Sequence, residues 1–324
     1  MPDLFHPQLL PATIGAALGL PVLVLAYLWL FKRWERTGRR ARWIMLALLA
    51  LLETGYWLNI YAWFIEPNVL VVRRVEIVSE NWRGAPLTIA AIGDTHVGGP
   101  HVDAARMGRI VARINELRPE LVVLLGDYVN GHAAEAERTP AENQDIVGGI
   151  ATFAALRARY GVVAVIGNHD VWYDRTTVTT ALQDAGAAAL WNRHIAIRRS
   201  GGVIVVAGLE DDLTGNPDFT AALDGAPAGA DTIVISHSPD PFVDMPAGAA
   251  LMIASHGHCG QVTIPLIGRP ILPLRNKRFG CGLIEEDGKQ LYVTAGIGTS
   301  IAPLRFLNPP EIVLIALQSA QRAD

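Results

Sequence analysis

The chain has 324 residues, of which 51% are hydrophobic and only 18% are charged. This balance is more apolar than that of an average soluble domain, so we expect part of the chain to lie in lipid. The formal net charge of -4 and the local clustering of the arginines exclude a broad basic surface, so no nucleic-acid partner is predicted. Cys259 and Cys281 can form at most one disulfide, cannot supply a zinc-ribbon ligand set and leave the redox compartment open.

Two stretches near the N-terminus are typical of transmembrane helices. Residues 13–31 carry no charge and residues 43–65 carry only Glu53, and each stretch is long enough to cross a hydrocarbon core at about 1.5 Å per residue. A buried helix of a soluble protein is disfavoured, because charges flank both runs. A cleaved signal peptide is also disfavoured, since no Lys or Arg precedes the first run. We therefore predict a retained membrane anchor of two helices over residues 1–66.

The loop between the two stretches predicts the orientation of the anchor. Against a single Glu35 it carries six basic residues, Lys32, Arg33, Arg36, Arg39, Arg40 and Arg42. Short basic loops stay on the cytoplasmic side, which predicts a hairpin in the inner membrane with the rest of the chain on the extracytoplasmic side. Glu53 falls in mid-membrane, where it either marks a functional contact or is a protonated carboxyl bonded to the partner helix, and we assign it no role.

Beyond residue 66 the pattern changes to short strands alternating with helices. Strands are predicted over residues 87–92, 121–125 and 162–166, with amphipathic helices over residues 102–117 and 145–160 between them. Later strands are predicted over residues 203–207, 232–235, 251–254, 291–294 and 312–317. The alternation predicts an α/β domain, and the later strands predict a second sheet.

Polar side chains follow five of these strands. Asp94 and His96 come after the first, Asp127 after the second, and Asn168, His169 and Asp170 after the third, while His237, His256 and His258 follow two later strands. Taken singly, a Gly-Asp pair is more often a turn and a strand-end His more often a hydrogen-bonded surface or core residue. Because ligands gather at the carboxyl ends of strands in α/β sheets, we expect these groups to converge. Their mixed oxygen and nitrogen donors suffice for two cations that share one carboxylate.

The order of these motifs resembles the signature of calcineurin-like metallophosphoesterases. The matching segments are Gly93-Asp94-Thr95-His96, Gly126-Asp127, Gly167-Asn168-His169-Asp170, Ser236-His237 and His256-Gly257-His258. The bacterial membrane-associated branch is similar in its C-terminal pattern, which here comprises residues 256–261, Gly296-Ile297-Gly298-Thr299-Ser300, Arg305-Phe306 and Pro310-Glu311-Ile312. The resemblance implies a four-layer αββα sandwich over residues 67–324, preceded by the transmembrane hairpin.

The resemblance also implies roles for individual residues. It places Asp94, His96 and His258 on a first metal ion, Asn168, His237 and His256 on a second, and Asp127 as the bridge between them. His169 is left free of metal, to stabilise the phosphoryl charge or to protonate the leaving group. Asp170 is expected either to fix an imidazole through a hydrogen bond or, as an equal alternative, to cap a helix.

Two positions depart from the pattern of the family, and neither removes a ligand. Ser255 stands where relatives commonly carry glycine, and Cys259 stands where a small residue is usual. Cys259 is adjacent to a predicted ligand, so it is either an oxidisable thiol or, the interpretation we favour here, an inert packed one. The donor set suits manganese, which we favour, as well as iron, zinc or magnesium.

The segment 262–274 bears on the substrate. It is mostly apolar, contains three prolines and is followed by Arg275, Lys277 and Arg278. Such a segment either presses into the bilayer and brings the metal site to lipid phosphates, or packs as ordinary core. We predict a hydrolase of a membrane-borne phosphodiester or pyrophosphate, with the lipid bilayer as partner and no particular protein partner indicated. The alternatives are a phosphatase for soluble nucleotides or sugars and a catalytically silent membrane sensor.

Overall fold

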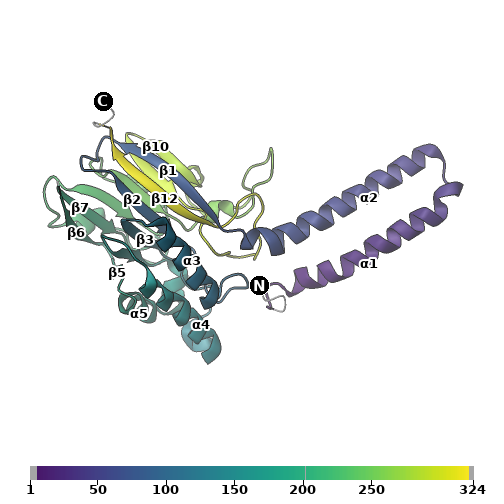
Figure 1. The fold of residues 1–324 in the computed structure, drawn as a ribbon, viewed down its shortest axis with the longest axis horizontal. Coiled ribbons are helices and arrows are strands. Elements are labelled where there is room, and N and C mark those ends of the chain that lie inside the picture. Colours follow the sequence, from purple (N-terminus) through teal and green to yellow (C-terminus); the bar gives the residue numbers. More distant parts are fainter. Residues whose placement is uncertain (1–5, 201, 321–324) are drawn as a thin grey trace.

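The computed structural model describes residues 6–200 and 202–320. Two long helices, α1 (Leu10–Arg33) and α2 (Arg39–Ile60), run antiparallel and project away from the rest of the chain (Figure 1). A short turn, Trp34–Arg36, joins them. At its far end α2 continues through a π-helical turn, Tyr61–Ile65, and a 3-10 turn, Glu66–Asn68, into the first strand. The predicted domain boundary at residue 66 falls in this turn.

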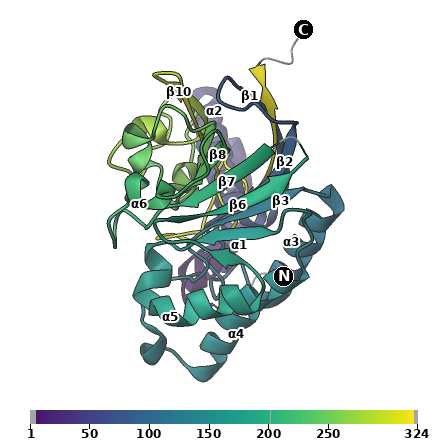
Figure 2. The same cartoon turned by 90° about the vertical axis from the view of Figure 1, so that its left-hand side faces the viewer.

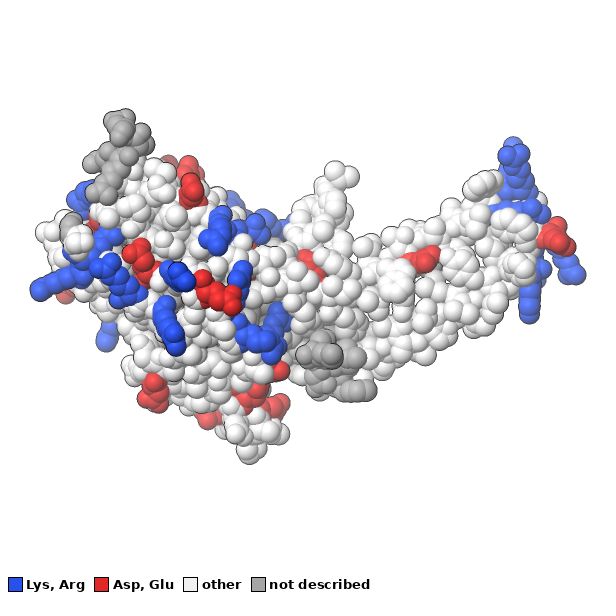
Figure 3. Space-filling model, viewed as in Figure 1, with Lys and Arg blue, Asp and Glu red and all other residues white. Residues whose placement is uncertain are grey.

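The surface of the hairpin is apolar along its length. Both helices are long and apolar enough to cross a membrane, and side chains such as Leu18, Leu25 and Leu51 are exposed. Basic residues gather at the loop end of the hairpin (Figure 3). Between the helices, the Tyr27 hydroxyl donates to Glu53 Oε2 at 2.7 Å, so Glu53 contacts the partner helix. Lipid is the environment that suits so much exposed hydrocarbon, and the hairpin therefore indicates membrane association.

The remaining chain forms two six-stranded mixed sheets (Figure 2). The first has the order β1 (Val71–Ser79), β12 (Glu311–Ser319), β2 (Leu87–Ile92), β3 (Leu121–Leu125), β4 (Val162–Val165) and β5 (Ala188–Ala189). The second has the order β10 (Gly282–Glu286), β11 (Lys289–Val293), β9 (Leu251–Ala254), β8 (Asp231–Ile235), β7 (Gly202–Gly208) and β6 (Arg193–Arg199). Strands β2, β3 and β4 run parallel to one another, as do β7, β8 and β9.

The layers confirm the predicted αββα class. Helices α3 (Ala104–Leu117), α4 (Pro140–Ala151) and α5 (Asn168–Asp184) cover the outer face of the first sheet. Apolar side chains of the two sheets meet in a central core, with Ile89 and Val123 from one and Ile233 and Ile253 from the other. The outer face of the second sheet is covered by the short α6 (Phe219–Leu223) and by loops rather than by long helices.

The helix predicted over residues 145–160 was wrong at both ends. Helix α4 begins at Pro140, because Thr139 caps it by accepting the N–H of Glu142. It ends at Ala151, and a 3-10 turn, Thr152–Ala155, follows. The predicted strands over residues 87–92, 121–125 and 251–254 coincide with β2, β3 and β9.

Candidate metal centre

The predicted site residues all lie in loops or helix starts that follow parallel strands of the two sheets. Asp94 and His96 follow β2, Asp127 follows β3, Asn168 and His169 open α5 after β4, His237 follows β8, and His256 and His258 follow β9. Parallel strands end at the same edge of their sheet, so the loops bring these side chains together. The ligand-like atoms form three groups, each within 4.8 Å: Asp94, His96 and His258; Asp127, His237 and His256; and His96, Asp127 and His169.

Asp127 belongs to two of the three groups and lies between them. Its Oδ2 is 3.2 Å from Nε2 of His237 and 3.9 Å from Nε2 of both His96 and His169. Asn168 joins the same centre, because its Oδ1 is 3.2 Å from Nε2 of His237. The structure thus brings every predicted ligand together. Which cation each one binds stays a prediction, as does the absence of His169 from the ligand set.

Much of the backbone at this centre is in the left-handed region. Five predicted ligands have a positive φ: Asp94, His96, Asp127, His256 and His258. Each such residue costs of order 1–3 kcal/mol, and strain of this kind persists only where the surroundings hold it. Gly126 also has φ +87, and a Cβ there would lie 2.5 Å from the amide nitrogen of Gly167. The close approach of two loops therefore requires glycine at position 126.

Two imidazoles are oriented by backbone carbonyls. His96 Nδ1 lies 3.1 Å from the carbonyl oxygen of Val129, and His237 Nδ1 lies 2.8 Å from that of Leu125. A carbonyl only accepts hydrogen bonds, so Nδ1 carries the proton in each ring. When such a ring is neutral, as a ring that binds a cation must be, it presents the lone pair of Nε2 to the centre, which is the arrangement that outer hydrogen bonds impose on metal-binding histidines.

One buried carboxylate oxygen shows that these residues fit a cation. Asp94 is fully buried, and its Oδ1 accepts the N–H of His256 at 3.1 Å. Its Oδ2 has no hydrogen-bond partner among the described residues. A buried carboxylate oxygen without a partner is costly, and a divalent cation among these oxygen and nitrogen donors would compensate it.

The pKa values at the centre follow from burial and from mutual charge. Burial raises the pKa of Asp94 to about 7, and the charge of Asp127 adds to the rise. Burial also favours the neutral form of Asp127, but the imidazoles of His237 and His169 outweigh it and hold that pKa well below its usual range. For His237, burial is outweighed by the Asp127 and Asp94 carboxylates, which raise its pKa well above the usual value. The Asp127 and Asp94 carboxylates therefore favour positive charge on the neighbouring His237.

Comparison with known proteins decides the family. Residues 87–256 match the calcineurin-like phosphoesterase family. The chain belongs to this family. It is 27% identical over 268 residues to the uncharacterized metallophosphoesterase YkuE of Bacillus subtilis, covering 80% of this chain and 89% of that protein. It is 28% identical over 347 residues to a transmembrane protein with metallophosphoesterase domain of Danio rerio. That match covers 97% of this chain and 75% of the other protein. It is 27% identical over 269 residues to the phosphodiesterase YaeI of Escherichia coli. That match covers 79% of this chain and 92% of YaeI.

This calcineurin-like protein is therefore a metal-dependent hydrolase of phosphoester bonds. Its family works with two metal ions, and the side-chain groups described above are of the kind that holds them. The apolar hairpin, together with a relative that is named a transmembrane protein, indicates association with a membrane.

Asp170 positions the loop that carries Asp127. Its carboxylate accepts the N–H groups of Asp127 at 2.8 Å, Tyr128 at 2.7 Å, Val129 at 3.1 Å and Gly167 at 2.9 Å. Of the two roles considered for Asp170, the hydrogen bond to an imidazole was wrong. The role at the start of a helix agrees better with the structure, because Asp170 is the third residue of α5 and accepts the N–H of Gly167, the residue before that helix. Burial and the charge of Asp127 raise the pKa of Asp170 to about 7, while the backbone N–H donors favour its charged form.

Replacing Asp170 by asparagine is expected to lower stability. The amide offers one accepting oxygen, so its NH₂ group faces two of the four backbone N–H donors. An unsatisfied buried polar group costs about 1–3 kcal/mol, and we expect a loss of about 2–3 kcal/mol in the free energy of unfolding. Denaturant titration of the detergent-solubilised protein measures it. Asp218→Asn is the control, because Asp218 caps α6 at an exposed site where asparagine caps equally well. Equal losses in the two variants would contradict the role given to Asp170.

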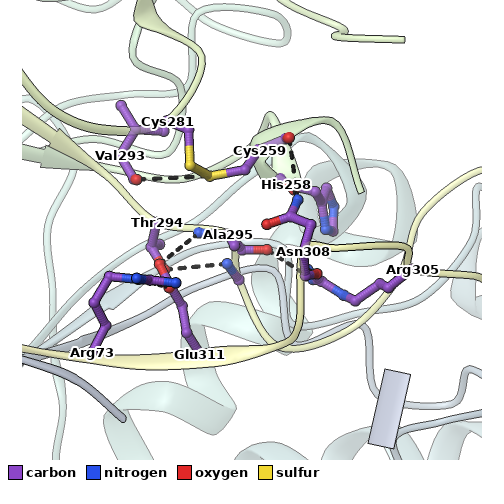
Figure 4. The surroundings of a disulfide bond; sticks show 11 residues. Arg73, His258, Cys259, Cys281, Val293, Thr294, Ala295, Arg305, Asn308 and Glu311 are labelled. Carbon is purple, nitrogen blue, oxygen red and sulfur yellow. Dashed lines mark hydrogen bonds and ion pairs between the residues drawn. A yellow bond between two sulfur atoms is a disulfide. The ribbon is translucent and has the colours of Figure 1, made fainter. Parts of the chain in front are cut away.

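Cys259 and Cys281 form a disulfide (Figure 4). The expectation of a packed free thiol at Cys259 was therefore wrong, because β10 brings Cys281 beside the turn that carries His258. The bond is buried at Cys259.

Two aromatic residues at the mouth of the centre were not predicted from the sequence. His132 and Trp172 lie against His169, with ring centroids 4.9 Å and 5.0 Å from its ring. Neither follows a strand directly or belongs to a recognisable motif. The folding of the Asp127 loop back over α5 brings His132 to the site, whereas Trp172 lies within α5, three residues after His169.

Proposed function

We propose that the protein is a membrane-anchored phosphodiesterase or pyrophosphatase that acts on a lipid at the extracytoplasmic face of the inner membrane. The substrate class is a membrane-borne phosphoester, such as a phospholipid headgroup or a glycolipid precursor. The observation that carries the proposal is an apolar cavity directly in front of the metal centre.

The cavity has a volume of about 540 Å³, which is within the range of small-molecule sites. Predicted ligands, including Asp127, Asn168 and His258, form its base. Its walls are largely hydrocarbon and come from Trp172, Leu213, Val262, Pro270, Ile271, Pro273, Ile301, Ala302 and Leu304. The ribose and base of a nucleotide, or the hydroxyls of a sugar, would leave their polar groups unpaired against such walls. A lipid places its phosphate on the base and its hydrocarbon against the walls.

Exposed apolar side chains belong to the lining of this cavity (Ile271 and Ile301) or to the segment between two of its lining residues, Val262 and Pro270. Leu266 is fully exposed, Ile267 and Ile271 are 72% and 63% exposed, and Ile301 is 78% exposed. These four side chains are therefore not packed in a hydrophobic core, which was the alternative considered for this segment. Contiguous exposed hydrocarbon of this kind is typical of a surface that meets a membrane. We call these four residues the apolar rim.

The apolar rim is connected to the end of the hairpin. The N–H of Thr263 donates to the carbonyl of Phe306 at 2.8 Å, and the ring of Phe306 packs edge-to-face on Tyr61 at 6.4 Å. The N–H of Arg305 donates to the carbonyl of Ala62 at 2.9 Å. The segment 262–274, which carries three of the four rim residues, projects on the side of the domain from which α2 leaves (Figure 1). If the hairpin spans the bilayer, these contacts hold the mouth of the cavity at the lipid surface.

Two observations support the extracytoplasmic side. The loop of the hairpin carries the excess of basic residues, which favours the cytoplasm for that loop and the opposite side for the catalytic domain. The Cys259–Cys281 disulfide independently favours an oxidising compartment, because such bonds are rare in the cytosol.

The proposed chemistry combines bound divalent cations with proton donation by His169. Divalent cations, for which we propose manganese, lower the pKa of water and stabilise charge on phosphoryl oxygens when bound. His169 donates from Nδ1 to the carbonyl of Gly131 at 2.7 Å, which turns its Nε2 toward Asp127 and the cavity. From Nε2 a protonated His169 can donate to the phosphoryl oxygen or to the departing alkoxide.

Replacing Leu266 by aspartate is expected to lower activity on lipid substrates but not on soluble ones. Removing one inserted leucine costs about 1.5–3 kcal/mol of membrane contact, so kcat/KM on lipid in vesicles should fall at least about tenfold. Hydrolysis of a soluble aryl phosphodiester should stay unchanged. Aspartate tolerates the φ of +69 at this exposed position, so folding should be preserved.

Val78→Asp is the matched control, since Val78 is an exposed valine near the end of β1 that is distant from the hairpin. Equal activity of Leu266→Asp and wild type on vesicles would count against the membrane role of the rim. A preference of the wild type for soluble nucleotides over lipid would favour the soluble-phosphatase alternative. A manganese-loaded protein that hydrolyses neither would be the silent sensor.

A further inference from the structure

We infer that the membrane hairpin is a working part of the metal centre, because Glu66 at its end and Asn308 hold the turn that carries His258. In this view Glu66 and Asn308 are positioning residues for a predicted metal ligand, and the hairpin is more than a tether. The inference rests on the metal dependence of the proposed function, but not on its lipid substrate.

The turn after β9 is the most strained part of the centre. Four non-glycine residues within six positions have a positive φ: His256, His258, Cys259 and Gln261. The ring of His258 also lacks the support that His96 and His237 have, because its Nδ1 has no hydrogen-bond partner among the described residues. The position of this imidazole therefore depends on how firmly the backbone of the turn is held.

Asn308 holds two consecutive carbonyls of that turn. Its Nδ2 donates to the carbonyl of His258 at 2.8 Å and to that of Cys259 at 3.1 Å (Figure 4). Both N–H groups of a single amide are thus committed to the backbone of the turn, and Asn308 is only 8% exposed. The disulfide holds the same turn through Cys259, from the side of β10.

Glu66 in turn holds Asn308. This carboxylate follows the π-helical turn at the end of α2 and is only 1% exposed. It accepts the backbone N–H of Leu307 at 2.8 Å and also that of Asn308. A buried carboxylate that receives two adjacent N–H groups fixes the path of that backbone. Two side chains therefore connect the end of α2 to the backbone of His258.

The neighbouring contacts make the end of α2 rigid. The buried guanidinium of Arg106 donates to the carbonyl of Pro67 at 2.8 Å and to Oδ1 of Asn68 at 2.9 Å. These bonds attach the junction to the catalytic domain without touching the His258 turn. Asn68 therefore offers a control that loosens the junction but leaves the contacts of Glu66 in place.

The test is the affinity for Mn²⁺ of the full chain in detergent, followed by the EPR signal of free Mn²⁺. We expect Glu66→Gln and Asn308→Leu each to weaken the binding of at least one Mn²⁺ ion about tenfold or more, as is typical when the outer support of a ligand is lost. Asn68→Ala should bind as the wild type does. Asn308→Leu keeps the size of the side chain and removes both donors, whereas Glu66→Gln leaves one acceptor for the two N–H groups.

The visible spectrum of the Co²⁺-loaded protein gives a second readout, because it reports the geometry of the ligands, and it should change in both variants. Should Asn308→Leu fail to fold, Glu66→Gln carries the test alone. Wild-type Mn²⁺ affinity and an unchanged Co²⁺ spectrum in the folded variants would overturn this inference and leave the proposed function intact. A wild type that binds neither metal would instead overturn the proposed function itself.

Discussion

Asp127→Asn is expected to lower kcat/KM on every phosphoester by about 10³-fold and to reduce bound metal. Asp127 belongs to two of the three ligand groups, and its Oδ2 faces the imidazoles of His96, His169 and His237. Asparagine keeps the shape but loses the negative charge that lies between these rings. A preorganised charge at such a centre contributes about 10²–10³-fold, and the loss of the predicted shared ligand adds to this. The measurements are the rate with an aryl phosphodiester and the metal content.

Asp240→Asn is the control for this experiment. Asp240 is also a buried carboxylate, but it accepts the backbone N–H groups of Arg275 and Asn276 and belongs to none of the ligand groups. It should retain both metal and activity, within the limits of its stability. Full metal content and near wild-type rates in Asp127→Asn would contradict the central place given to this carboxylate.

The sequence predicted the strands that are buried on both faces and the loops that follow them. Leu121–Leu125 and Leu251–Ala254 are apolar throughout, and the structure buries every residue in them. Short runs of this kind are typical of strands in the interior of a sheet. Because β2, β3 and β4 run parallel to one another in the first sheet, and β8 and β9 in the second, the polar residues that follow them lie at one edge of each sheet. Convergence of the candidate ligands within each sheet therefore follows from local patterns.

The missed strands lie toward the edges of the sheets. Strand β1 carries Arg73, Arg74 and Glu76, and β6 begins and ends with arginine, so neither has the continuous apolar run of a central strand. An edge strand needs to bury only one face and tolerates charge on the other. Strand β1 pairs with β12, which lies far away in sequence, and local periodicity does not contain that information.

The residues that hold the metal-centre loops in place could not be predicted from the sequence for a similar reason. Glu66 and Asn308 are separated by 242 positions, and neither belongs to a motif. The pairing of Cys259 with Cys281 likewise depends on where β10 lies. Ligands could be recognised by residue type and position after a strand. The residues that hold them are ordinary side chains, whose role exists only once the two sheets and the hairpin are assembled.

His169→Gln is expected to lower kcat by about 10²–10³-fold while the protein keeps its metal. The backbone N–H of His169 donates to Oδ1 of Asp127 at 2.9 Å, and this contact survives the substitution. What is lost is the imidazole beside the cavity, and general acid catalysis contributes about 10²–10⁴-fold. A good leaving group needs less protonation, so the loss should be larger for an alkyl than for an aryl phosphodiester.

The same variant decides whether His169 is a metal ligand. It lies with His96 and Asp127 in one of the three groups, so geometry alone permits ligation. A ligand would lose metal when replaced, whereas a general acid would lose turnover and leave Mn²⁺ affinity and KM near the wild-type values. His194→Gln is the matched control, because His194 Nδ1 also lies 2.9 Å from a backbone carbonyl, that of Ala222, but outside the centre. If His169→Gln loses Mn²⁺ and loses the same factor on alkyl and aryl substrates, His169 is a ligand and the role of general acid fails.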